Sequence, residues 1–232
     1  MTTSDARGSF RLHIAHEGFD FEPATIDDPV PTGAQLLNAA GRHPAPDHLI
    51  FQLLPHGALE EIRPEETVDL RAPGRERFIT FRSDRSFRMH VDEQARDWGL
   101  QTVTGLQLKQ LARVVPTDHD VFHIVVGGED RLIRDNEIFD LGGAEVERFA
   151  TRRIALEVFV NTRPHQVHQR VLDFWSVVRL AHPDANPADE NAEYTVTYSR
   201  GPHANPAGNL VIGQSVEVKG GMEFYVLLTD KS

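Results

Sequence analysis

Two short stretches of the sequence decide its fold: residues 32–36 read Thr-Gly-Ala-Gln-Leu, and residues 104–108 read Thr-Gly-Leu-Gln-Leu. In each stretch the threonine hydroxyl can accept a hydrogen bond from the backbone amide of the glutamine. The glutamine side chain can in turn accept one from the backbone amide of the threonine. This reciprocal arrangement is a capping box, which begins a helix. The predicted helix caps are Thr32, Gln35, Thr104 and Gln107. The chain therefore begins a helix in the same way twice.

The apolar spacing after the second box supports this interpretation. Leu108, Leu111, Ala112 and Val115 recur at the spacing that places side chains on one face of a helix. Pro116 is predicted to end this helix, because proline lacks an amide proton and its ring clashes with the preceding turn. A short amphipathic helix is therefore predicted after each box.

The likeness between the two stretches extends to their surroundings. Five pairs of similar residues share an offset of 71 positions, namely Phe51 and Phe122, Ile62 and Ile133, Leu70 and Leu141, Phe78 and Phe149, and Thr80 and Thr151. Further upstream, the strand-like residues 10–14 resemble residues 87–91. Five anchors at one offset indicate an internal duplication.

A third and more diverged copy follows. Residues 156–160 alternate in the manner of an opening strand, and Phe224 takes the place of Phe78 and Phe149. Asp173 is the predicted cap of a helix that runs to residue 181, although the Thr-Gly-x-Gln pattern is absent there. We therefore predict three copies of one unit.

Each copy is predicted to contain strand, strand, helix, strand, short strand and strand, with the short strand of the first copy at residues 68–70. One helix laid across one face of a mixed sheet is a β-grasp arrangement, so the predicted fold class is α+β with three tandem β-grasp domains. The predicted boundaries are a flexible tail at 1–9 and units at 10–82, 87–151 and 154–232. The short linkers favour a compact or stiff array.

These motifs resemble the bacterial multi-ubiquitin domain family over most of the chain from Phe10 to Ser232. The resemblance rests on the opening Phe-Arg strands, the two capping boxes, the Asp-Leu and Phe-x-Thr endings, the turn at 160–164, the strand at 194–198 and the terminal residues 229–232. It implies ubiquitin-like β-grasp units in tandem that act as a protein modifier or polyprotein. It also implies three partners, namely an E1-like adenylating enzyme, an E2-like conjugating enzyme and a metallopeptidase, and a role in defence against phage.

The C-terminus departs from ubiquitin-type modifiers, which end in a flexible diglycine tail that fits the narrow channel of the adenylating enzyme. Here the candidate conjugation tail is Thr229, Asp230, Lys231 and Ser232. The late diglycine, Gly220-Gly221, precedes an apolar strand, and cleavage there would remove that strand from the core. Ser232 supplies the reactive carboxylate, or a peptidase trims the last residues, or the protein is not conjugated.

Composition narrows the classes of function. The formal net charge is −11, and the acidic residues are spread over all three copies, which disfavours nucleic-acid binding. No apolar run approaches the roughly 18 residues of a membrane span, and the polar N-terminus is unlike a signal peptide, so a cytoplasmic location is expected. The chain has no cysteine, and of its 24 lysines and arginines only Lys109, Lys219 and Lys231 are lysines. Acceptor amines for lysine-linked branching are therefore scarce.

Twelve histidines raise the question of a metal site. The close pairs, His13 with His16 and His165 with His168, lie on predicted strands or turns, where residues three apart point to opposite faces and cannot chelate one ion. No metal site, cofactor or recurring catalytic pattern is expected, and we predict that the chain is not an enzyme.

The sequence thus predicts a ubiquitin-like modifier whose tandem copies form a preformed chain, so that one attachment delivers several binding surfaces. The alternative is a non-covalent scaffold or filament whose units associate through sheet edges or exposed faces.

Overall fold

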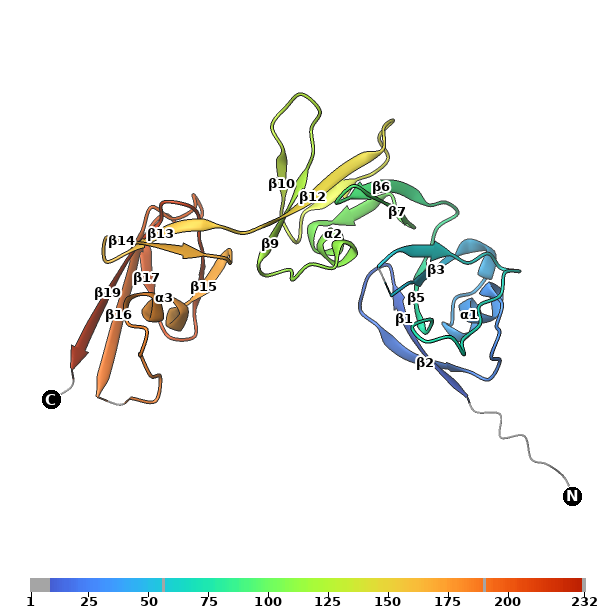
Figure 1. Ribbon diagram of the computed structural model, residues 1–232, viewed down its shortest axis with the longest axis horizontal. Coiled ribbons are helices and arrows are strands. Elements are labelled where there is room, and N and C mark those ends of the chain that lie inside the picture. Colours follow the sequence, from blue (N-terminus) through green and yellow to red (C-terminus); the bar gives the residue numbers. More distant parts are fainter. Residues whose placement is uncertain (1–8, 56, 190, 231–232) are drawn as a thin grey trace, which may run out of the picture. The chain divides into compact units, whose positions relative to one another are not determined.

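The computed structural model describes residues 9–55, 57–189 and 191–230, which fall into two compact units (Figure 1). The first unit comprises the residues up to Pro116 together with Asp120–Thr151. The second comprises Thr117–His119 and the residues from Arg152 onward. Three β-grasp modules are distributed over these units, two in the first and one in the second.

The first module begins the chain and has one helix against a five-stranded sheet. Its elements are β1 (Phe10–His16), β2 (Glu22–Ile26), α1 (Gly33–Ala39), the 3-10 helix η1 (Ala45–Asp47), β3 (Leu49–Leu53), β4 (Leu59–Glu61) and β5 (Arg77–Phe81). The strand order is β2-β1-β5-β3-β4, and β1 and β5 are parallel. Figure 1 shows α1 in blue beside this sheet.

The second module repeats this plan and adds a two-stranded ladder. Its elements are β6 (Phe87–Val91), β7 (Gln94–Trp98), β8 (Thr102–Thr104), α2 (Gly105–Ala112), β9 (His119–His123), β10 (Arg131–Ile133), β11 (Ile138–Asp140) and β12 (Glu147–Arg153). The sheet order is β10-β9-β12-β6-β7, with β6 and β12 parallel, and β8 pairs with β11.

The third module has the same topology. Its elements are β13 (Leu156–Val160), β14 (Arg163–Val167), β15 (Val171–Asp173), α3 (Phe174–Ala181), β16 (Ala192–Ser199), β17 (Gly208–Leu210), β18 (Ser215–Glu217) and β19 (Glu223–Asp230). The sheet order is β14-β13-β19-β16-β17, and β15 pairs with β18. In the described residues there are thus three mixed five-stranded sheets, each with one helix, and the predicted fold class of three tandem ubiquitin-like β-grasp domains is confirmed.

In the second and third modules the structure adds β8 and β15 before the helix, strands that the sequence pattern does not reveal. Each module also has an unpredicted edge strand of three residues, namely β4, β10 and β17. Such short segments, for example Leu59-Glu60-Glu61, are too brief for a recognisable alternation. They extend the edge of each sheet next to β3, β9 and β16.

The short strand predicted at residues 68–70 is not formed in the first module. The amides of Val68 and Leu70 donate to the carbonyl oxygens of Pro31 and Pro29, and one isolated bridge joins Thr32 to Thr67. Because proline has no amide proton, the return hydrogen bonds of a ladder cannot form there. The second module has no proline at its corresponding β8 and forms the ladder with β11.

Both capping boxes are present in the structure, and the packing explains their glycine. The threonine side chains accept from the glutamine amides at 3.3 and 3.2 Å, and the glutamine side chains accept from the threonine amides at 2.7 and 2.9 Å. A Cβ on Gly33 would lie 2.3 Å from the Arg63 carbonyl oxygen, and one on Gly105 would lie 2.2 Å from that of Arg134. Each helix start therefore lies against the following loop at a distance that only glycine permits.

The third module begins its helix differently. Asp173 accepts from the Ser176 amide at 2.7 Å, and Phe174 stands where the other helices have glycine. The amide of Phe174 donates to the Gln214 carbonyl oxygen at 3.2 Å, and its ring is buried. The bulkier residue is accommodated because it contributes to the core of this module.

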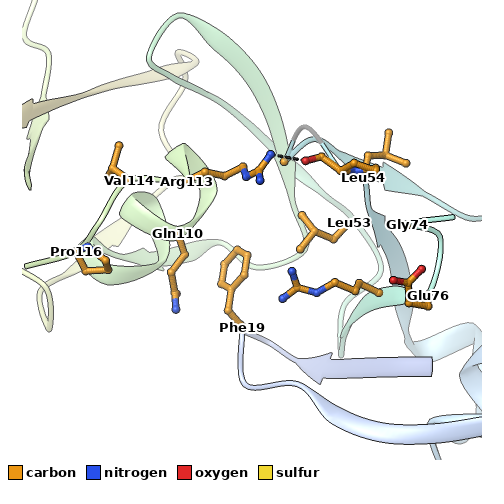
Figure 2. A pocket seen from close by; sticks show the side chains of 12 residues that line it. Phe19, Leu53, Leu54, Gly74, Glu76, Gln110, Arg113, Val114 and Pro116 are labelled. Atoms are coloured by element: carbon orange, nitrogen blue, oxygen red, sulfur yellow. Dashed lines mark hydrogen bonds between the residues drawn. The ribbon is translucent and has the colours of Figure 1, made fainter. Parts of the chain in front are cut away.

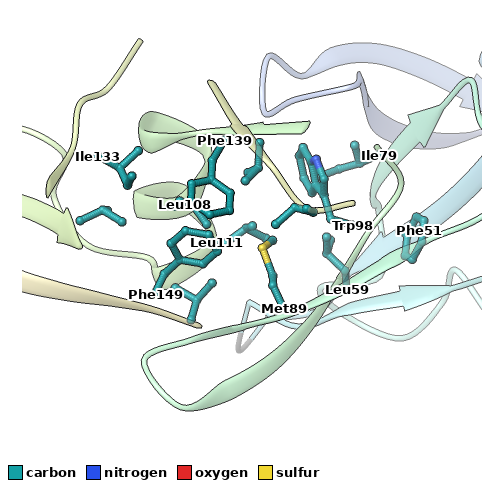
Figure 3. Packing of buried hydrophobic residues seen from close by; sticks show 14 of the residues in the cluster. Phe51, Leu59, Ile79, Met89, Trp98, Leu108, Leu111, Ile133, Phe139 and Phe149 are labelled. Carbon is teal, nitrogen blue, oxygen red and sulfur yellow. The ribbon is translucent and has the colours of Figure 1, made fainter. Parts of the chain in front are cut away.

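One apolar cluster extends through the first two modules (Figure 3). It contains the core of the second module under α2, including Leu108 and Phe149, and reaches Trp98 at the sheet edge. It then continues into Phe51 and Phe81 of the first module, on the sheet face away from α1. The first module's sheet is therefore buried on both faces, which fits the apolar runs in β3 and β5.

Candidate functional site

The C-terminal strand β19 carries the candidate conjugation segment. Its side chains alternate between the two faces of the sheet, so Phe224 and Val226 are buried in the core while Tyr225 and Leu227 are 48% and 63% exposed. All eight residues of β19 pair with β16, from Glu223 opposite Ser199 to Asp230 opposite Ala192. The strand therefore lies in the middle of the module's sheet and is paired along its whole length with β16.

The other edge of β19 is paired only at its beginning. The parallel ladder with β13 covers Glu223 and Phe224. At Val226 the side chain of Asn161 closes the edge, because its Nδ2 donates to the Val226 carbonyl oxygen and its Oδ1 accepts from the Val226 amide, both at 2.9 Å. Among the residues that the structure describes, β16 is the one strand that pairs with β19 from Leu227 onward.

The predicted tail residues lie at this end of the strand. Thr229 and Asp230 are the last residues of β19 and pair with Glu193 and Ala192. Lys231 and Ser232 lie outside the described residues. The first half of the predicted tail is thus extended and held on one side by backbone pairing.

The diglycine lies at the opposite end of β19, in the turn that leads from β18. Gly221 has φ +78°, and its amide donates to the Glu157 carbonyl oxygen at 2.8 Å. Cleavage after Gly221 would separate Phe224 and Val226 from the core. This geometry supports the interpretation of Gly220-Gly221 as a structural turn.

The predicted cap residues lie far along the chain from this segment. Thr32 with Gln35, and Thr104 with Gln107, begin helices α1 and α2, and Asp173 begins α3. Gln107 has a second contact, because its Nε2 donates to the Glu17 carbonyl oxygen at 2.9 Å. One cap residue of the second module therefore also binds the first module.

A cleft of about 430 Å³ lies where the first two modules meet (Figure 2). The Arg113 side chain crosses it and donates a hydrogen bond to the Pro55 carbonyl oxygen. A Cβ on Gly57 would lie 2.5 Å from Cδ of Arg113, so Gly57, with φ +86°, permits this approach. The other walls combine apolar side chains, such as Phe19, Leu53 and Val114, with the polar side chains of Glu76, Arg77 and Gln110. The cleft thus belongs to the contact between the modules.

The close histidine pairs make separate contacts. His16 Nδ1 lies 3.2 Å from the Thr80 carbonyl oxygen, and His168 Nδ1 lies 2.8 Å from that of Ile154. In the part of the chain that the structure describes, no three histidine, aspartate or glutamate side chains are grouped to hold a metal ion.

The perturbed carboxylates belong to local turns. Hydrogen bonds from Arg71 lower the pKa of Asp69 to about 2, and the Arg71 Nε lies 2.8 Å from Asp69 Oδ1. In the second module the hydrogen bond from the backbone amide of Arg134 lowers the pKa of Glu137. Partial burial of the carboxylate raises this pKa, and the side-chain hydrogen bond from Arg131 lowers it further. The hydrogen bonds that cause these shifts stabilise loops, and both carboxylates lie outside the C-terminal strand.

The comparisons with known proteins identify the family. A family model described as Multiubiquitin matches residues 19–83, 87–154 and 156–230, one match for each module. No curated protein matches the chain. In the described residues no helix has the length and apolar character needed to cross a membrane. The matches cover most of the sequence, and the chain belongs to the Multiubiquitin family.

Proposed function

We propose that this chain is a ubiquitin-like protein modifier of three modules, attached to other molecules through the C-terminal segment of the third. The proposal rests on family membership and on one structural observation: from Leu227 onward β19 is extended and paired on one side only, and Leu227, Leu228 and Thr229 are exposed. An adenylating enzyme and a conjugating enzyme would act on this segment, and a metallopeptidase would trim it where trimming is needed. These partners, a cytoplasmic location and a role in phage defence follow from the resemblance.

The buried core of the module ends at Val226, and the segment that could be presented to an enzyme begins at Leu227. Val226 is 6% exposed and is held by Asn161, whereas Leu227 is 63% exposed. Releasing the following residues from β16 would break one edge ladder and leave the packing of Phe224 in place. An enzyme that needs a thin extended backbone could therefore take this segment without unfolding the module.

The chemistry of the proposed attachment is acyl transfer. The terminal carboxylate attacks the α-phosphorus of ATP, forming an acyl adenylate and releasing pyrophosphate. An enzyme thiolate then attacks the acyl carbon and displaces AMP, which gives a thioester. The chain itself supplies only the carboxylate and its presentation.

One attachment would deliver two kinds of binding surface. The first module has its outer sheet face covered by the second, as the burial of Phe51 and Ile79 shows. The third module keeps this face open, with Tyr225 and Leu227 exposed. The preformed chain therefore offers unequal modules, and avidity would come from the faces that remain open.

The test uses the full chain with its adenylating enzyme, ATP and a conjugating enzyme. We expect a thiol-sensitive adduct with the full chain, and its loss when the residues from Thr229 onward are deleted. The deletion retains Phe224 and Val226, and an unchanged thermal melt would show that the module is still folded. An adduct that persists after the deletion, or no adduct with the full chain, contradicts the proposal.

A non-covalent scaffold is the second candidate function. The observation that favours it is the docking of the second module on the sheet face of the first, which shows that modules of this chain can associate through faces. Light scattering of the pure protein decides this point. Assembly without any covalent adduct would favour the scaffold over the modifier.

A further inference from the structure

The three lysines of the chain differ sharply in accessibility. Lys109 lies in α2 and its side chain is only 6% exposed. Lys219 is exposed in the turn before β19, and Lys231 lies outside the described residues. Since the other basic side chains are arginines, which are not acyl acceptors at ordinary pH, few amines can receive a modifier.

The amine of Lys109 is fully engaged by its neighbours. Its Nζ lies 2.5 Å from Oδ1 of Asp135 and donates to the Pro116 carbonyl oxygen at 2.9 Å. Bringing this amine to a thioester would require withdrawing the buried Lys109 side chain from its packing and breaking its contacts with the half-exposed Asp135 and with the Pro116 carbonyl oxygen. Lys109 is therefore a structural residue of the second module.

The surroundings of Lys219 are open. The Met222 amide donates to the Lys219 carbonyl oxygen at 3.2 Å, which forms the turn. At Gly220 and at Gly221 no atom lies within 4 Å of the place a Cβ would take. Within the described residues, the Lys219 amine has neither an ion-pair nor a hydrogen-bond partner. An extended acyl-enzyme segment could therefore approach the amine without displacing protein atoms.

Lys219 and the C-terminal segment lie at opposite ends of β19. The eight residues of the strand span roughly 23 Å at about 3.3 Å per residue. Lys231 and Ser232 extend at most about 7 Å beyond Asp230. Whether it is paired with β16 or held extended in an enzyme, the segment leads away from Val226 on the side opposite Lys219, so its carboxyl group stays out of reach of the Lys219 of the same molecule. Transfer to this amine is therefore expected between two molecules.

We propose that Lys219 is the acceptor amine through which one copy of this protein is joined to the next, an inference that rests on the proposed modifier function. The uncharged amine attacks the thioester carbonyl carbon, the N–C bond forms, the C–S bond breaks, and the sulfur leaves as a thiolate. The attacking nitrogen loses a proton to solvent. One acceptor per molecule yields linear, unbranched polymers.

The experiment compares two readouts on the full chain with its activating and conjugating enzymes and ATP. Discharge of the thioester onto free lysine reports activation alone. Formation of a ladder of multimers on a denaturing gel reports transfer between copies. Lys219→Arg is expected to lose the ladder and keep the discharge, because arginine retains the charge but is not an acceptor. Gly220→Ala, next to Lys219 in the same turn, meets no atom within 4 Å, retains the amine, and is the matched control that is expected to keep both.

Each other result has a definite meaning. A ladder that persists in Lys219→Arg overturns the assignment, and mass spectrometry of the linked peptide would then locate the true acceptor. Discharge without a ladder in the wild-type chain, or a cyclised monomer, overturns it as well. Loss of discharge in the wild-type chain would overturn the modifier function itself, and the assignment of Lys219 with it.

Discussion

Trp98 of the second module packs edge-on against Phe81 of the first, with ring centroids 4.7 Å apart and planes at 71°. Phe19 stacks on the same indole at 5.9 Å. Trp98 is fully buried, and a Cβ on the neighbouring Gly99 would lie 2.3 Å from the Phe81 ring. These contacts hold the second module against the face of the first module's sheet that lies away from α1.

Trp98→Ala is expected to destabilise the first unit by about 3–5 kcal/mol, the usual cost of truncating a buried aromatic side chain. Urea unfolding followed by circular dichroism gives the free energy. Hydrogen exchange should rise in β3 and β5 of the first module, because the covering module is no longer held there. Trp175→Ala is the matched control in the third module, where the indole is half-buried against Tyr194. Unchanged exchange in β3 and β5 would contradict the role of Trp98.

Gly33→Ala and Gly105→Ala are expected to destabilise their modules by about 1–3 kcal/mol, as overpacking does. This sign is opposite to the usual gain when alanine replaces glycine in a helix. The cause is the backbone carbonyl oxygen of Arg63 or Arg134, which a new Cβ would approach within 2.3 or 2.2 Å. Thermal melts measure the effect. Gly220→Ala, which meets no atom within 4 Å, is the control and should change little. A stabilised Gly105→Ala protein would show that the loop can move away.

Glu137→Gln is expected to lower stability near neutral pH by about 0.5 kcal/mol, the range for a partly exposed charged contact. The backbone amide of Arg134 lowers the pKa of Glu137 below its ordinary 4.5 in the folded state. A lowered folded-state pKa contributes stability above the unfolded value, and that contribution is lost as the pH falls through the folded value. The difference between wild type and variant should therefore shrink in acid. Urea midpoints at about pH 7 and about pH 3 test this.

Glu129→Gln removes the same charge from an exposed carboxylate in the loop between β9 and β10 and serves as the control. A gap between Glu137→Gln and wild type that widens in acid would contradict the proposed electrostatic cause.

Asn161→Gly is expected to loosen the end of β19 while keeping the module folded. Glycine permits the φ of +48° found at this position, so the substitution removes the side chain without backbone strain. Both hydrogen bonds to Val226 are lost, each contributing about 1 kcal/mol. Hydrogen exchange should rise from Val226 onward and remain low at Phe224. Asn161→Asp, which retains the acceptor for the Val226 amide, should give an intermediate result. Equal protection in all three proteins would show that β16 alone holds the strand.

The fold was predictable because its signals are local and repeated. A capping box states its own geometry in four residues, and both boxes have the predicted hydrogen bonds. The strand at residues 68–70 was not formed, because Pro29 and Pro31 face it, a relation between segments far apart in sequence. The edge strands β4, β10 and β17 depend on neighbours in the sheet and carry too few residues for a pattern.

The candidate site was less accessible to sequence reasoning. The last residues of the sequence indicated the conjugation segment. The hydrogen bonds from the Asn161 side chain to the Val226 backbone were not predictable, because the two residues are 65 positions apart. The joining of the first two modules had one available signal, namely that β3 and β5 are apolar on both faces. In the third module Tyr225 and Leu227 occupy the positions of Ile79 and Phe81 and are exposed. Side-chain type alone does not distinguish a covered face from an open one.

The burial of Phe51, Ile79 and Phe81 separates two things that usually coincide in a tandem array, the segment that was duplicated and the segment that can fold by itself. Separating the gene between residues 82 and 87 would leave the first copy with an apolar sheet face exposed to water. The second copy would have Trp98 exposed to solvent. We therefore expect the first two modules to be exchanged between genes together, as one folding unit, and the third module to be exchanged on its own.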